Sequence, residues 1–239
     1  MAPPIAQDRQ LMDPRFRATG AAVAILAAGA IAGALLDDGF RLLHYACKPL
    51  ATVLIAVYAM RAAPPVSARY RAAVLAGLAC SLAGDVFLML PQDLFVPGLV
   101  AFLLAHLCYI VAFFPGAGTV PRVLGLLAYM AFAGCNLVLP LPSVPAALRV
   151  AVLVYVGVLM LMAGLATARA WSLRHDRRLA APARAAALGG MLFVLSDSLL
   201  AWDRFGGGLP LAMLFILATY YAAQWCIAHS VAPSGRAPA

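Results

Sequence analysis

Long apolar runs separated by short polar stretches occupy most of the 239-residue chain. A helix needs roughly 20 apolar residues to cross a bilayer, and eight runs reach or approach that length. They are residues 18–36, 46–61, 72–90, 96–114, 122–140, 146–168, 184–202 and 209–229. Because the connections are short, the pattern predicts an all-α polytopic membrane protein, with a single bundle of about eight transmembrane helices over residues 18–230.

The two ends of the chain lack this pattern. Residues 1–17 and 231–239 are polar or proline-rich, and we expect both to be flexible. The first apolar run contains an Ala-Ile-Ala sequence at 30–32 that resembles a signal-peptide cleavage site. The length of the run favours an uncleaved span, and cleavage would leave the topology of the other seven runs unchanged.

Composition and charge agree with a membrane protein. The chain is 65% hydrophobic and 11% charged, whereas soluble domains are about 45–50% apolar and about 25% charged. The net charge of +8 comes from basic residues in short loops, a pattern typical of oriented membrane proteins rather than of nucleic-acid binding. Placing both termini in the cytoplasm puts 13 of the 17 Lys and Arg residues on that side, as expected in a bacterial inner membrane.

The cysteines and histidines give no sign of a metal site. The five cysteines lie within or beside apolar runs without a CxxC pair, and the four histidines lack HxxxH or HExxH spacing. We therefore expect neither a metal nor another cofactor.

Two carboxyl groups interrupt apolar helices: Asp85 in SLAGDVFLML (81–90) and Asp197 in LFVLSDSLLAW (192–202). Each lies five or six residues before the outer end of its run, roughly 8–9 Å deep at the rise of an α-helix. A charge at mid-membrane costs about 2.5–3.5 kcal/mol and usually faces the bundle interior or a wet cavity. We predict that both carboxyl groups meet in a functional site. The structural alternative is that each bonds a neighbouring helix or a buried cation.

Other polar residues fall at compatible heights in the predicted helices. His106 and Tyr109 are three residues apart, and Tyr220 and Gln224 are four apart, so each pair shares a helix face. Snorkelling of Lys48 to the headgroups and ordinary helix packing of the others are the alternatives. As a set these residues predict a polar cavity that opens toward the outer leaflet: Lys48, Ser81, His106, Tyr109, Asn136, Ser196, Tyr220 and Gln224.

At these motifs the sequence resembles the YhhN-like lysoplasmalogenase family of multipass membrane proteins. The resemblance covers about residues 45–229, and it rests on CKPLAT (47–52), SLAGDVFLML (81–90), FVPGLVAFLLAHLCYI (95–110) and FVLSDSLLAWDRF (193–205). It implies an eight-helix hydrolase that cleaves the vinyl ether bond of lysoplasmalogens to a fatty aldehyde and a glycerophospho-alcohol. The implied partners are a lysophospholipid substrate and the lipid bilayer.

The chemistry of a vinyl ether suits a pair of carboxyl groups. The bond is stable to base and breaks after protonation at carbon, so the enzyme needs an acid that keeps its proton at neutral pH. Burial and a second carboxylate nearby favour the neutral form of one group, and the ionised group can deprotonate water. We prefer Asp197 as the acid and Asp85 as the base. Lys48 and outer-loop arginines such as Arg204 are candidates to hold the phosphate.

Three other functions remain open. A proton-coupled transporter would also use buried acids, although no broken helix is evident. An intramembrane aspartyl protease is disfavoured because Leu82 replaces the first glycine of its GxGD motif, and Ser196 replaces the tyrosine of its YD motif. A non-catalytic scaffold is the third possibility.

Overall fold

The computed structural model describes residues 14–36 and 38–233. Eight helices in this part of the chain are long and apolar enough to cross a membrane, and the described residues form no β-strand. The predicted all-α membrane fold is therefore confirmed. The helices are α2 (Pro14–Leu35), α3 (Arg41–Arg61), α4 (Ala68–Met89), α5 (Phe95–Phe113), α6 (Thr119–Leu137), α7 (Ala146–Ser172), α8 (Ala180–Phe205) and α9 (Ala212–His229), with short 3-10 turns η1 (Asp38–Phe40) and η2 (Leu141–Ser143).

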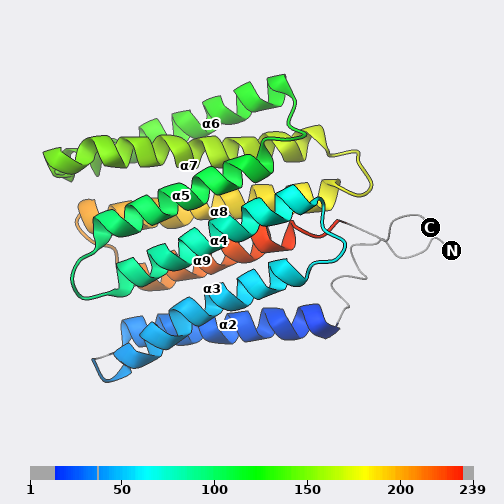
Figure 1. Cartoon of the computed structure of the whole chain (residues 1–239). Coiled ribbons are helices and arrows are strands. Elements are labelled where there is room, and N and C mark those ends of the chain that lie inside the picture. The colour runs from blue at the N-terminus through cyan, green and yellow to red at the C-terminus, as the bar shows by residue number, and fades with distance from the viewer. Residues whose placement is uncertain (1–13, 37, 234–239) are drawn as a thin grey trace.

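The helices form an up-and-down bundle in which most neighbours along the chain also pack together (Figure 1). In addition, α5 packs against α7, and α9 returns to α2 and α3. One end of the bundle holds the start of α2 and the end of α9, and we call it the terminal end. The opposite end holds the turns around residues 36–40, 90–94, 138–145 and 206–211, and we call it the cavity end.

Several helices differ in length from the apolar runs that predict them. Helix α7 continues to Ser172, four residues beyond the predicted end, and the Ser172 hydroxyl donates to the Ala168 carbonyl. Helix α8 continues through Trp202 to Phe205, because apolar composition stops before helical hydrogen bonding does. Helix α6 instead ends at Leu137, shortly before Pro140, since proline disfavours helical geometry in the residue before it.

The predicted flexible ends are only partly within the described residues. Residues 1–13 and 234–239 lie outside them, but α2 already begins at Pro14. Val231, one residue beyond the predicted boundary, is fully buried. Its carbonyl accepts a hydrogen bond of 2.8 Å from the Val66 amide, so this segment joins the α3–α4 turn to the core.

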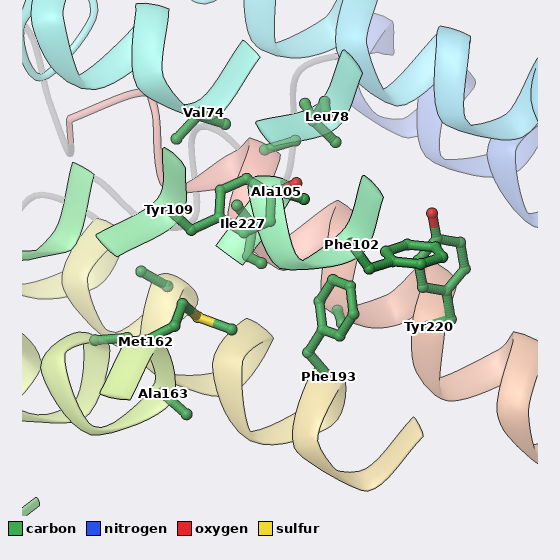
Figure 2. Packing of buried hydrophobic residues seen from close by; sticks show 14 of the residues in the cluster. Val74, Leu78, Phe102, Ala105, Tyr109, Met162, Ala163, Phe193, Tyr220 and Ile227 are labelled. Carbon is green, nitrogen blue, oxygen red and sulfur yellow. The ribbon is translucent and has the colours of Figure 1, made fainter. Parts of the chain in front are cut away.

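A packed apolar cluster fills the bundle between the cavity and the terminal end (Figure 2). Tyr109, Met162 and Ile227 are among its fully buried side chains. The rings of Phe102, Phe193 and Tyr220 form its boundary toward the cavity, in edge-on contacts with centroids 5.6–6.1 Å apart. Such contacts favour one ring arrangement, so this cluster forms a rigid support beneath the polar residues described below.

Close packing of α8 on α9 depends on Gly189. A Cβ atom added there would lie 2.7 Å from Ile227 Cγ1 and 2.9 Å from the Ala223 carbonyl oxygen. We therefore expect Gly189→Ala to destabilise the protein by about 1–3 kcal/mol, measured by unfolding in detergent. Gly157→Ala is the matched control, because no atom lies within 4 Å of its added Cβ. Equal stability of the two variants would contradict this packing.

Candidate active site

A cavity of about 110 Å³ opens in the cavity-end half of the bundle, and side chains of seven helices line it. Most of the lining is apolar, including Leu88, Leu99 and Leu159. The polar exceptions include six of the residues that the sequence singles out. They are Lys48, Asp85, Asn136, Ser196, Asp197 and Tyr220.

The Asp85 carboxylate is buried and has three polar partners on two other helices. The hydroxyls of Thr52 and Tyr220 each donate to Oδ2 at 2.7 Å. The Lys48 ammonium lies 3.8 Å from Oδ1 and is itself buried. A buried carboxylate needs paired charge and hydrogen-bond donors, and these three groups supply them to Asp85. Lys48 thus has Asp85 as its partner rather than a position at the headgroups.

The Asp197 carboxyl group has a different environment. Tyr155 donates a hydrogen bond to its Oδ2, and the side chain keeps 15% exposure toward the cavity. The nearest basic group is His106, whose Nε2 lies 3.8 Å from Oδ2. Among the described residues, Asp197 has no lysine or arginine as a partner.

Hydrogen-bond directions define the tautomer of His106. Its Nε2 lies 3.0 Å from the Tyr155 hydroxyl, whose proton is already donated to Asp197. Nε2 must therefore carry the proton and donate. The fully buried Nδ1 has no partner among the described residues, and a proton there would be an unsatisfied donor in an apolar site. This geometry favours the tautomer of His106 with its proton on Nε2.

A second set of hydrogen bonds extends from Asp85 away from the cavity. Tyr220 receives a bond of 3.2 Å from Gln224 Nε2, and Tyr109 donates to Gln224 Oε1 at 2.8 Å. Ser81 is fully buried one helical turn from Asp85 and is not among the cavity-lining residues. Tyr109, Gln224 and Ser81 thus lie behind the cavity wall, whereas Tyr220 itself lines the cavity.

The two carboxyl groups line one cavity, but they do not form a hydrogen bond with each other in the described part of the chain. Their distances from the helix ends also differ, since Asp85 is four residues before Met89 and Asp197 is eight before Phe205. The apolar runs predicted that the two carboxyl groups lie equally far from the ends of their helices. In the structure these two distances differ. Their common position comes from the way the helices pack.

An exposed ion pair joins the end of α8 to the α4–α5 turn, next to the cavity-lining Phe95. Arg204 Nη2 donates to both carboxylate oxygens of Asp93 at 2.9 and 3.0 Å, and its guanidinium carbon lies 4.1 Å from the centre of the Phe95 ring. Arg204 therefore already has an acidic partner at the place where the sequence suggested a phosphate-binding arginine. No group of three His, Cys, Asp or Glu residues suited to a metal ion occurs among the described residues.

Two polar contributors to the site were missed from the sequence. Thr52 follows Lys48 by four residues, which places both on one face of α3, so this spacing could have revealed it. Tyr155 is the only side chain with a strong hydrogen-bonding group between Arg149 and Thr167. Its position as an isolated polar residue in an apolar helix could have identified Tyr155 from the sequence.

Comparison with known proteins identifies similar sequences. The YhhN family matches residues 43–231. Lysoplasmalogenase TMEM86B of Homo sapiens is 38% identical over 165 residues, which cover 69% of this chain and 65% of the human protein. Lysoplasmalogenase TMEM86B of Sus scrofa is 34% identical over 204 residues, covering 79% of this chain and 74% of the pig protein. The chain thus spans about two thirds to three quarters of these relatives, and no solved structure matches it.

The Tyr155 hydroxyl joins Asp197 to His106, so its removal leaves two buried polar groups without their partner. We expect Tyr155→Phe to lower the free energy of unfolding by about 1–3 kcal/mol, measured by denaturation in detergent. The control is Tyr129→Phe, because the Tyr129 hydroxyl makes a longer, half-buried contact of 3.3 Å with Thr167. A loss for Tyr155→Phe no larger than that of the control would refute the bridging role.

Proposed function

Because the chain belongs to the YhhN family, we propose that it hydrolyses the vinyl ether bond of lysoplasmalogen-like lysophospholipids. The products are a fatty aldehyde and a glycerophospho-alcohol. The names of the relatives support the reaction class. The observation that carries the proposal for this chain is the pair of carboxyl groups, Asp85 and Asp197, on one largely apolar cavity.

In the proposed reaction Asp197 is the general acid. Its proton passes to the vinyl carbon remote from the ether oxygen, and the adjacent carbon becomes part of an oxocarbenium ion. Water adds to that carbon and loses a proton to Asp85. The resulting hemiacetal gives up its hydroxyl proton while the glycerol oxygen gains one, and the carbon–oxygen bond breaks. One water is consumed, and proton return from Asp85 to Asp197 restores the site.

The environments of the two groups support this division of roles. Lys48 and the two hydroxyl donors stabilise Asp85 as an anion, the form that a general base needs. Asp197 instead lies beside Tyr155 and His106, with no lysine or arginine partner among the described residues. This difference in surroundings supports Asp197 as the proton donor and Asp85 as the base.

A proton-coupled transporter is the second candidate, because hydrogen bonds link Asp85 through Tyr220 and Gln224 to Tyr109. A transporter must also open a route to the other side of the membrane. A packed cluster that includes Met162 and Ile227 fills part of the bundle interior (Figure 2). The geometry therefore favours hydrolysis within a cavity that opens on one side.

We also propose an orientation with the terminal end in the cytoplasm of a bacterial cell. Loops at that end hold basic residues such as Arg174, Arg177 and Arg178, and cytoplasmic loops are enriched in Lys and Arg. The cavity would then open toward the outer leaflet of the inner membrane.

The reaction is tested by supplying a 1-alkenyl lysophospholipid to the purified protein and following aldehyde with a coupled alcohol dehydrogenase. We expect Asp85→Asn and Asp197→Asn each to lower kcat by about 10²–10⁴-fold, since each removes a group that transfers a proton. Asp176→Asn is the matched control. Asp176 is exposed in the α7–α8 loop, where its carboxylate accepts from the Leu179 and Arg178 amides.

Near-normal turnover in either cavity variant would overturn the two-acid mechanism. Wild-type protein that releases no aldehyde, but shows substrate-dependent proton flux in liposomes, would favour the transporter instead. Thermal unfolding of each variant shows whether a loss of activity reflects a loss of fold.

A further inference from the structure

The cavity is small compared with the proposed substrate. Its volume is about 110 Å³, and one water-sized group needs about 10–15 Å³ on such a scale, so it holds roughly ten such groups. The long hydrocarbon chain of a lysophospholipid alone has more non-hydrogen atoms than that. If the ether carbon lies beside Asp85 and Asp197, much of the chain must therefore lie outside the cavity.

Helices α5 and α6 contribute to the wall of the cavity without packing closely on each other. Both helices line the cavity, through Leu99 on α5 and Phe132 on α6. Helix α6 packs closely on α7, where a Cβ atom added to Gly125 would lie 2.8 Å from the Gly164 carbonyl oxygen. In the described part of the chain, however, α6 makes little contact with α5. The gap between these two helices is therefore not closed by direct helix packing.

Phe132 lies at the edge of this gap. Its side chain lines the cavity, and the residue is 44% exposed. Leu127 and Met130 on the same helix are also exposed, and a spanning helix with such side chains faces lipid hydrocarbon. The Phe132 ring thus borders both the cavity and the bilayer interior.

We propose that this gap is a lateral portal through which the substrate enters from the bilayer. The hydrocarbon chain of the lysolipid passes between Leu99 and Phe132 and stays partly in the membrane, while its ether end reaches the carboxyl groups. This inference rests on the proposed hydrolase function. It adds that the protein takes a single-chain lipid already dissolved in the bilayer, with little selection for chain length beyond the cavity.

Enlarging the side chain at the portal tests the route. In Phe132→Trp, and in Leu99→Trp on the opposite side, kcat/KM for a long-chain 1-alkenyl lysolipid is expected to fall about tenfold more than for a short-chain analogue. Leu127→Trp is the matched control, since Leu127 is 61% exposed on α6 and is not among the cavity-lining residues. Equal losses for long and short chains, or no loss in either portal variant, would overturn the proposal.

A second measurement does not depend on hydrolysis. A lysophosphatidylcholine with a photoreactive group at the end of its acyl chain has no vinyl ether, and it can be cross-linked to the wild-type protein in nanodiscs. Labelling that unlabelled lysolipid competes away is expected on the facing parts of α5 and α6. Competable labelling confined to other helices, such as α2 and α3, would refute the portal. If the protein releases no aldehyde but α5 and α6 are labelled, the hydrolase function is rejected and the lateral portal is retained.

Discussion

A carboxylate inside an apolar helix bundle must be neutralised by its neighbours, and the arrangement around Asp85 follows from that requirement. Its partners are Lys48 and Thr52 on α3 and Tyr220 on α9. Removing one partner of a buried charge leaves the other uncompensated, which costs more than the pair contributes. The ion pair and its two hydroxyl donors therefore fix the relative positions of three helices, and they place an anion on the cavity wall.

The second carboxyl group differs from the first in its surroundings. Asp197 lies beside Tyr155 and His106 instead of an ammonium group. Different environments are how enzymes obtain an acid and a base from two carboxyl groups. Both groups line one cavity, although they do not bond to each other in the described residues.

Sequence reasoning succeeded where a property is local to one helix. Apolar length predicted the eight spans, and an acid such as Asp85 in an apolar run was visible as an anomaly. Contacts between helices could not be read in this way. The Lys48 ammonium pairs with Asp85, and the exposure of Phe132 reflects how far α6 lies from α5. Helix ends also differ from the predicted ones. Helix α8, for example, continues to Phe205, beyond the end of its apolar run.

In the proposed reaction the proton that the vinyl ether receives comes from Asp197, and Asp85 accepts a proton from water. Infrared spectroscopy of protein labelled with carbon-13 aspartate, reconstituted in lipid, detects the carbonyl stretch of a protonated carboxyl group directly. The account predicts such a band in the wild-type protein that disappears in Asp197→Asn and persists in Asp85→Asn. A band that persists in Asp197→Asn and disappears in Asp85→Asn would contradict it, as would the absence of any protonated carboxyl band in the wild-type protein.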